Sequence, residues 1–378
     1  MQGRPQLAAT GVIRIDASNK SQQRGPHGSF RYFGKLAPDV TRDILDRAAD
    51  ALGSVDGPLV DLMCGSGTTL IEAADRDWAS VGVDVNPVAC LYSRVKTRSI
   101  NRQRLHELLF EIEWSPLNCS ETEIQEVFGG TLNADRWFSR TAQEQIAALR
   151  HMIGILPDSR ERDLLLATLL SRLRRASNAS ARTGRIFYDP QSAVNDVRRD
   201  FLTAALAVAD RTPPKDLLTE VITGDARATG LPDAHFQIVF CHPPYFGLYR
   251  FSADVLRFEL EIGGWSRRSV AEKEVEEGWK SGDRLRLDTH VADMSAVFRE
   301  AHRISRTDGA MALVASNSTL GDHQLPVVDR LADVAYASGW RLHSHLERLA
   351  HFGSATYHKS ARSDKVISRD HVLLFLTD

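Results

Sequence analysis

Cysteine is scarce in this sequence, and the cysteines do not pair. Four are spread over 378 residues, and no two have the spacing of a metal or disulfide motif: they are Cys64, Cys90, Cys119 and Cys241. This pattern indicates neither a zinc site nor a disulfide framework, and it is typical of a reducing compartment. We expect a cytoplasmic protein that holds no metal.

A surplus of positive charge is also missing. Lysine and arginine number 47 against 49 aspartates and glutamates, which gives a net charge of −2. A chain without a global basic field binds nucleic acid through a local patch, which argues against tight, non-specific DNA binding. No apolar run has the length of a membrane span and no signal peptide is evident, so we expect no membrane partner.

What the chain does have is enough apolar residues for a large core. Hydrophobic residues make up 43% of the 378 positions, and this length favours one large domain with an insertion, or two domains. Apolar runs of strand length alternate with stretches of helical periodicity. This alternation predicts an α/β fold built on a doubly wound sheet.

The most informative stretch is residues 58–73. A short apolar run that carries Asp61 stops at a Gly-Ser-Gly-Thr-Thr turn, residues 65–69, and is followed by apolar residues at helical spacing. Strand, glycine turn and helix in this order predict the opening of a nucleotide-binding βαβ unit. The glycines let a ligand approach the backbone, and the following helix directs free N–H groups into the turn.

The next apolar run narrows the choice of ligand. Residues 79–84 end in Asp84, an acid placed to accept hydrogen bonds from the ribose hydroxyls of an adenosine group. The turn at 65–69 lacks the third glycine of a pyrophosphate fingerprint and the Gly-Lys-Ser/Thr ending of a phosphate loop. The alternative is an ordinary strand–turn–helix unit without a ligand.

Residues 61–69, Asp-Leu-Met-Cys-Gly-Ser-Gly-Thr-Thr, resemble the S-adenosylmethionine-binding motif of amino-methyltransferases that act on DNA at N4 of cytosine or N6 of adenine. The resemblance implies a Rossmann-like class I methyltransferase fold with a mostly parallel seven-stranded sheet, and S-adenosyl-L-methionine as cofactor. It also implies cofactor contacts at the matching positions. These are Lys35, Pro38, Asp61, Cys64, Gly65, Ser66, Gly67, Thr68, Thr69, Asp84, Asn86, Asp225 and Ala226.

Two of these regions have competing interpretations. Gly34, Lys35 and Pro38 match a family segment that covers the methionine end of the cofactor, but a plain N-terminal helix with a surface lysine would look the same. Asp225 follows the third predicted strand, where the resemblance implies contact with the adenine amino group. A structural Gly-Asp turn is the alternative there.

The second motif is His-Pro-Pro-Tyr at residues 242–245. Two successive prolines cannot continue a strand ladder, so they predict a rigid turn at the end of the buried strand 238–241, with a simple Pro-Pro loop as the alternative. In the resembled family, the residue before the prolines and the first proline carbonyl accept the two amino hydrogens of the base, and the aromatic residue stacks on it. The catalytic residues implied are His242, Pro243, Pro244 and Tyr245.

His242 departs from the family pattern, which has Asp, Asn or Ser at this position. A neutral imidazole can accept one amino hydrogen, and a protonated imidazole cannot. We therefore expect activity to fall as the pH drops below the His242 pKa, about 6.5 for an unperturbed histidine.

The rest of the sequence predicts the domain organisation. Residues 1–26 are polar and predict a mobile tail, and residues 27–100 with 216–378 form the predicted catalytic domain. Residues 101–215 show helical spacing and predict an insertion between the second and third strands, a candidate substrate-recognition subdomain.

Arginines cluster in this insertion, at Arg172, Arg174, Arg175, Arg182 and Arg185. They predict either a solvated face or a surface for a phosphate backbone. The candidate substrate contacts are Phe246, Tyr249, Arg174 and Arg175.

Together these features predict a methyltransferase of the restriction–modification type. It would act on an exocyclic amino nitrogen of a nucleobase in DNA, with N4 of cytosine ahead of N6 of adenine, and nucleic acid is its expected partner. The alternatives are an RNA base amino-methyltransferase, a small-molecule or nucleoside N-methyltransferase, and a non-catalytic binding module that keeps the fold.

Overall fold

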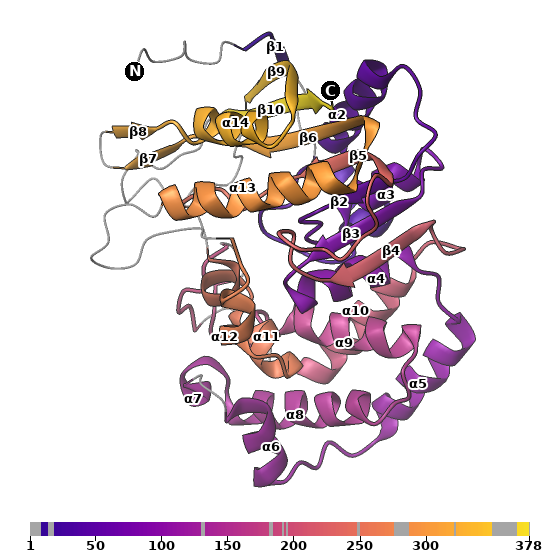
Figure 1. Cartoon of the computed structure of the whole chain (residues 1–378). Coiled ribbons are helices and arrows are strands. Elements are labelled where there is room, and N and C mark those ends of the chain that lie inside the picture. Colours follow the sequence, from indigo (N-terminus) through magenta and orange to yellow (C-terminus); the bar gives the residue numbers. More distant parts are fainter. Residues whose placement is uncertain are drawn as a thin grey trace.

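A mostly parallel sheet lies at the centre of the structure, a computed structural model (Figure 1). It describes residues 9–13, 19–129, 133–180, 184–190, 193, 196–247, 250–275, 287–320, 323–349 and 369–377. The eight described strands are, in spatial order, β1 (Gly11–Ile13), β9 (Arg341–Leu349), β10 (Arg369–Leu376), β6 (Ser305–Ala315), β5 (Phe236–Cys241), β2 (Leu59–Asp61), β3 (Ser80–Asp84) and β4 (Thr219–Thr223). β10 pairs antiparallel with both neighbours, and the other pairs in this sheet are parallel. A short antiparallel hairpin, β7 (Ser318–Leu320) with β8 (His323–Leu325), follows β6.

Helices cover both faces of this sheet. Ile238 of β5 packs in an apolar cluster with α2 (Pro38–Leu52), whereas Val239 packs in the cluster of α13 (Leu287–Ile304) and α14 (Val327–Ala337). Every residue of β5 is buried, as expected for a parallel strand that is covered on both sides. The doubly wound, mostly parallel α/β sheet predicted from the sequence is confirmed.

The N-terminal segment contains ordered elements. β1 pairs in parallel with β9, with Gly11 opposite Leu346, and Ile13 is only 2% exposed. The helix α1 (Asn19–Gln23) and the 3-10 turn η1 (Gly25–Gly28) follow. The prediction of a mobile tail is therefore wrong for these residues, and the described sheet has eight strands rather than seven. A three-residue strand is too short to leave a periodic pattern in the sequence.

A helical lobe lies beside the sheet, in the lower half of Figure 1. The described part of residues 101–215 is helical and is inserted after β3 and α4 (Pro87–Thr97), before β4, as the sequence predicts. Its helices are α5 (Arg102–Trp114), α6 (Glu121–Phe128), α7 (Ala134–Trp137), α8 (Arg140–Gly154), α9 (Arg160–Arg172) and α10 (Val197–Ala209). None of the helices in the described residues combines the length and apolar character needed to cross a membrane.

Three elements from beyond the His-Pro-Pro-Tyr turn complete this lobe. They are the π-helix η2 (Phe251–Val255), α11 (Arg257–Gly263) and α12 (Arg267–Ala271). Phe258 packs edge-on against Phe138 of the insertion, with ring centroids 5.1 Å apart, and both belong to one apolar cluster. Residues 251–271, which the sequence assigns to the catalytic domain, pack in one apolar cluster with the insertion and with α4.

Candidate active site

The glycine turn and the His-Pro-Pro-Tyr turn leave the sheet at the same edge. β2 and β5 are neighbouring parallel strands with Asp61 opposite Phe240, and the Leu62 N–H donates to the Phe240 carbonyl at 3.0 Å. Neighbouring strands lie about 4.8 Å apart. The two motifs, which are far apart in the sequence, therefore begin side by side.

The glycine turn needs its glycines. Gly65 and Gly67 have φ angles of +50° and +77°, which disfavour other residues. A Cβ on Gly67 would lie 2.9 Å from the Ser93 hydroxyl, and one on Gly65 would lie 3.2 Å from the Tyr32 ring. The helix α3 (Thr68–Ala74) begins directly after this turn.

Asp84 ties the glycine turn to the end of β3. Its Oδ2 accepts the Gly65 N–H at 2.8 Å, and its Oδ1 accepts the Asn86 N–H at 2.8 Å. The residue is half-buried, and burial raises its pKa to about 6. A carboxylate has about four lone-pair positions, so Asp84 keeps acceptor capacity for a ribose hydroxyl.

Most side chains of the turn point into the protein rather than toward a ligand. Asp61 is 2% exposed, burial raises its pKa to about 7, and it is hydrogen bonded to the Thr69 side chain and the Met63 N–H. The turn thus offers its backbone to a ligand. The other buried side chains among the predicted cofactor contacts at residues 61–69 are Cys64, Ser66, Thr68 and Thr69.

Two buried polar atoms near the turn have no hydrogen-bond partner among the described residues. They are Asn86 Nδ2 and Thr68 Oγ1. The Asn86 Oδ1 is occupied, because it caps α4 by accepting the Val88 N–H at 3.0 Å. Asn86 therefore caps α4 through its Oδ1. Its side-chain NH2 group has no hydrogen-bond partner among the described residues.

Lys96, in the last turn of α4, contacts the glycine turn from the interior of the protein. Its side chain is fully buried, and Nζ donates to the Ser66 carbonyl. Burial lowers its pKa well below the usual range. The sequence analysis did not assign Lys96 to the site.

The segment before α2 lies over the glycine turn. Lys35 Nζ donates to the His27 carbonyl at 3.0 Å and to the Gln22 carbonyl at 3.4 Å, and burial lowers its pKa to about 8. Pro38 is buried and starts α2. The Tyr32 ring, which faces Gly65, stacks with Phe251 of the helical lobe at 5.9 Å. Lys35 therefore fixes the chain rather than standing on the surface.

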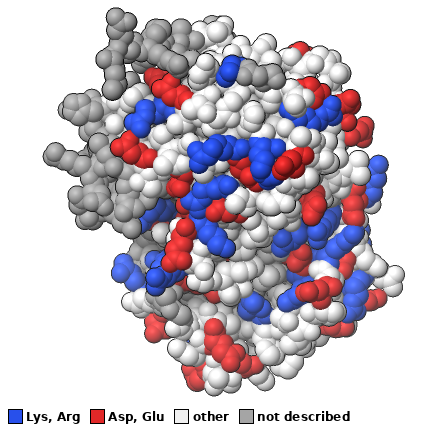
Figure 2. Space-filling model, in the orientation of Figure 1, with Lys and Arg blue, Asp and Glu red and all other residues white. Residues whose placement is uncertain are grey.

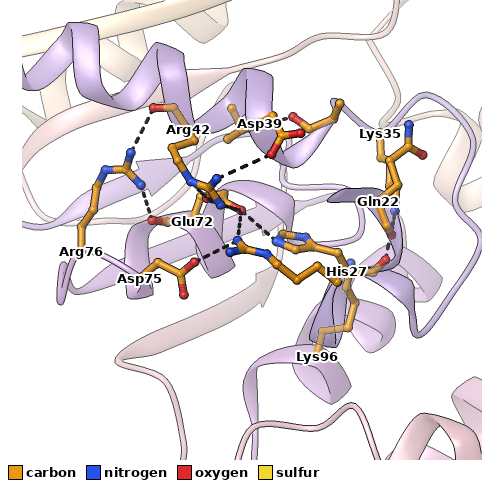
Figure 3. Close-up of polar contacts among 12 residues, drawn as sticks. Gln22, His27, Lys35, Asp39, Arg42, Glu72, Asp75, Arg76 and Lys96 are labelled. Carbon is orange, nitrogen blue, oxygen red and sulfur yellow. Dashed lines mark hydrogen bonds and ion pairs between the residues drawn. The ribbon is translucent and has the colours of Figure 1, made fainter. Parts of the chain in front are cut away.

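A buried carboxylate anchors this segment from α3 (Figure 3). Glu72 is fully buried and accepts from His27 Nε2 at 2.9 Å and from Arg42 Nε at 3.0 Å. Figure 3 shows His27 and Arg42 converging on Glu72 from different elements. No local pattern in the sequence marks this cluster, because its members come from three separate segments.

Asp225 lies in an ion-paired turn. The Arg227 guanidinium donates to its carboxylate at 2.8 Å and to Asp293 of α13 at 2.7 Å. Burial opposes ionisation of Asp225, but the hydrogen bonds from Arg227 lower its pKa overall. The neighbouring Ala226 is buried. The adenine contact predicted for Asp225 stays a prediction, and it would share the carboxylate with Arg227.

In the second turn, His242 and Tyr245 contact each other. His242 Nε2 lies 3.3 Å from the Tyr245 hydroxyl, and the rings are edge-on with centroids 5.3 Å apart. Both residues are half-buried, and Pro243 is buried. Burial lowers the pKa of His242 to about 4. The loss of activity below the His242 pKa stays a prediction, and the lowered pKa moves its expected position from about pH 6.5 to about pH 4.

Two of the predicted substrate contacts are buried instead. Phe246 is 2% exposed and packs in the core beside His290 of α13, with ring centroids 5.4 Å apart. Arg174 is 7% exposed, donates to the Gly184 carbonyl at 2.7 Å and lies over the Phe33 ring. Both predictions are wrong, because the local sequence does not reveal which side chains the lobe covers. Tyr249 lies outside the described residues.

The remaining described arginines of the cluster at residues 172–185 are paired with acids. Arg172 and Arg175 both contact Asp200, at 2.7 and 3.4 Å, and Arg185 lies 3.9 Å from Asp254. Arg182 is outside the described residues. Figure 2 shows basic and acidic side chains intermingled on the visible face. The described insertion therefore presents a charge-paired surface there.

Comparison with known proteins gives one short match in sequence. No protein-family model matches the chain. A segment of 95 residues is 30% identical to the type II methyltransferase M.MjaII of Methanocaldococcus jannaschii, and it covers 25% of this chain and 17% of that relative. The match thus spans less than a fifth of the relative's length.

Solved structures give broad but loose likenesses. An rRNA methyltransferase of Streptomyces viridochromogenes covers 91% of this chain and 88% of its own, at 12% identity and a TM-score of 0.33. A geranyl diphosphate C-methyltransferase of Streptomyces coelicolor covers 90% and 81%, at 8% identity and 0.37. A protein of Thermus thermophilus, provisionally assigned as a DNA modification methylase, covers 41% and 50%, at 15% identity and 0.25. TM-scores this low support no conclusion about function.

Proposed function

We propose that this protein is an S-adenosylmethionine-dependent methyltransferase that modifies an exocyclic amino nitrogen of a nucleobase. The observation that carries the proposal is the pairing of β2 with β5, which brings the glycine turn and the His-Pro-Pro-Tyr turn to one edge of the sheet. A ligand at one turn would then lie next to a substrate at the other.

The residues around the glycine turn fit an adenosyl cofactor. Gly65 and Gly67 give the turn its positive φ angles and let it pack closely against Tyr32 and Ser93. Asp84 is a half-buried acceptor at the end of the second strand of the βαβ unit. The unpartnered Asn86 Nδ2 and Thr68 Oγ1 are polar atoms that such a ligand could satisfy. When bound, the cofactor supplies a methyl group activated by its positive sulfur.

The second turn would hold and orient the amine. The lone pair of the amino nitrogen is delocalised into the base, so this nitrogen is a weak nucleophile. A neutral His242 ring nitrogen and the Pro243 carbonyl accept its two hydrogens, which directs the lone pair toward the methyl donor. The Tyr245 ring offers a face for the base. A base within a duplex would have to be flipped out to reach this turn.

We take DNA as the substrate, with N4 of cytosine ahead of N6 of adenine. The similarity of 95 residues to a type II methyltransferase supports this choice. One observation favours a small substrate such as a nucleoside instead, because the described arginines of the cluster at residues 172–185 are buried or paired with acids. Salt separates the two: binding of DNA weakens steeply as salt rises, whereas binding of a nucleoside does not.

Transfer of a labelled methyl group tests the proposal. We would incubate the protein with labelled S-adenosylmethionine and, in parallel, with DNA, RNA and free nucleosides, and then identify the methylated base after digestion. We expect label on a cytosine or adenine amino group of DNA. Label on RNA or nucleosides alone would mean that RNA or a nucleoside, rather than DNA, is the substrate. If no methyl group is transferred and no cofactor binds, the proposal is overturned.

A further inference from the structure

Two large aromatic side chains are exposed on the helical lobe. On α5, Phe110 is 64% exposed and Trp114 is 72% exposed. They are four residues apart, which places them on one face of the helix, and their ring centroids are 6.2 Å apart. We call these two residues the aromatic patch. The other apolar residues of α5 are buried, at Leu105, Leu108, Leu109 and Ile112.

The neighbouring helix α10 runs antiparallel beside α5 and adds to this surface. At one end of the pair, Arg102 contacts Asp210 at 3.0 Å. At the other end, Arg198 donates to the Glu113 carbonyl at 2.7 Å. Leu206 of α10, between these contacts, is 41% exposed. Both helices belong to the lobe, and α5 lies at its margin (Figure 1). Exposed apolar side chains with a polar rim are typical of a protein–protein interface.

The exposed charges of α5 are separated along the helix. Arg102 and Arg104 lie in its first turn, whereas Glu111 and Glu113 lie in its last turn, and all four are exposed. The helix dipole favours acids near the N-terminus and bases near the C-terminus. The order of charges in α5 is the reverse, and it is therefore unfavourable for the isolated helix. It suits a partner surface that carries the opposite order.

A second copy of α5 supplies that opposite order when the two helices meet antiparallel. With the helices aligned at Leu108, the middle of α5, Arg104 of each copy would lie beside Glu111 of the other, and the two Phe110 rings would lie close together. A parallel pair would instead bring like charges together. Phe and Trp side chains bury about 150–250 Å² each. The aromatic patch would thus supply a substantial part of the about 800 Å² that each partner contributes to a stable interface.

We propose that the protein forms a symmetric dimer in solution through α5, with the aromatic patches at its centre and opposite charges at its ends. The contact is isologous, because the same surface is used on both subunits. The inference is independent of the proposed function, since neither the glycine turn nor the His-Pro-Pro-Tyr turn takes part. Docking of a different protein on α5 is the alternative, and it would leave the isolated chain monomeric.

The oligomeric state of the full chain tests the aromatic patch. We would measure the mass by sedimentation equilibrium over a range of protein concentrations, and expect a dimer. The double variant Phe110→Ser, Trp114→Ser should raise the dimer dissociation constant on the order of 100-fold. Leu218→Ser is the matched control, because Leu218 is 66% exposed but lies next to β4. It should leave the dissociation constant unchanged.

The charged ends of α5 test the antiparallel arrangement. In Arg104→Glu, two acids face each other at both ends of the dimer, and in Glu111→Arg two bases do, so each variant alone should dimerise at least about tenfold more weakly. An equimolar mixture of the two variants restores opposite charges at both ends and should form a heterodimer. These exposed positions also keep the test independent of the aromatic substitutions.

Three results would overturn the inference. The first is a wild-type chain that stays monomeric at its highest soluble concentration. The second is a dimer that the double aromatic variant leaves as stable as before. The third is a dimer that neither charge substitution weakens, which would place α5 outside the interface or in a parallel pair. Methyl-transfer activity decides none of these outcomes, so failure of the proposed function would leave the dimer test intact.

Discussion

The sheet edge and the helical lobe use polar side chains in opposite ways. At the sheet edge, Asp84 and His242 are half-buried and keep acceptor capacity. In the lobe, Arg172 and Arg175 share Asp200, and Arg174 is buried against backbone carbonyls. The edge has polar groups with acceptor capacity for a ligand, whereas these three arginines of the lobe are occupied by the protein itself. We infer that chemistry belongs to the edge and that these arginines mainly stabilise the lobe.

The largest effect should come from removing the acceptor at the edge. His242→Phe keeps a ring but no acceptor nitrogen, and we expect methyl transfer to fall on the order of 100-fold or more. His242→Asn restores an acceptor oxygen and should stay within about tenfold of the wild type. Cofactor affinity should be the same in both variants. Wild-type rates in His242→Phe would remove His242 from the chemistry.

Substitutions of the buried arginine in the helical lobe should lower the stability of the protein rather than its affinity for substrate. Arg174→Met leaves Glu259, 3.9 Å away, as a buried acid without its cation, and we expect the free energy of unfolding to drop by about 3 kcal/mol. Arg175→Met removes an exposed side chain and should change it by less than about 0.5 kcal/mol. Urea titration measures both. If Arg174→Met lost affinity for substrate but kept its stability, Arg174 would be a substrate contact, and the contrast between the sheet edge and the lobe would fail.

A matched pair of glycines tests the turn. Gly67 and Gly230 both have positive φ, but only a Cβ at Gly67 meets another atom, 2.9 Å away, whereas nothing lies within 4 Å at Gly230. Each change to alanine should cost about 1 kcal/mol of stability for the backbone conformation. Gly67→Ala should also weaken S-adenosylhomocysteine binding at least about tenfold, measured by calorimetry. Equal affinities in the two variants would show that the turn does not hold the cofactor.

The pH dependence should separate two residues of the edge. Burial raises the pKa of Asp84 to about 6 and lowers that of His242 to about 4. Asp84 is a charged acceptor above about pH 6, so cofactor affinity should weaken as the pH falls below 6. The kcat should hold until His242 becomes protonated near pH 4. In Asp84→Asn, the affinity should be weaker and lose its dependence near pH 6. A kcat that falls near pH 6.5 would mean that His242 is not in the buried environment described.

The sequence predicts the parts of the site that lie within one local segment. Gly65, Gly67 and Asp84 stand out because a tight turn and an acid at a strand end have local signatures, and parallel strand order then brings the two turns together. Arg348 of β9 and Asp370 of β10 escape prediction because strand pairing alone brings them together. The burial of Phe246 and Arg174 escapes prediction for the same physical reason. Burial depends on what packs over a residue, and its neighbours in sequence do not specify that.

The most direct measurement of the central claim is a structure of the complex with S-adenosylhomocysteine. The account predicts that the ribose lies at Asp84 and that the sulfur faces the space between the glycine turn and the Pro243 carbonyl. A nucleoside bound away from the glycine turn, or a sulfur directed away from His242 and Tyr245, would contradict it.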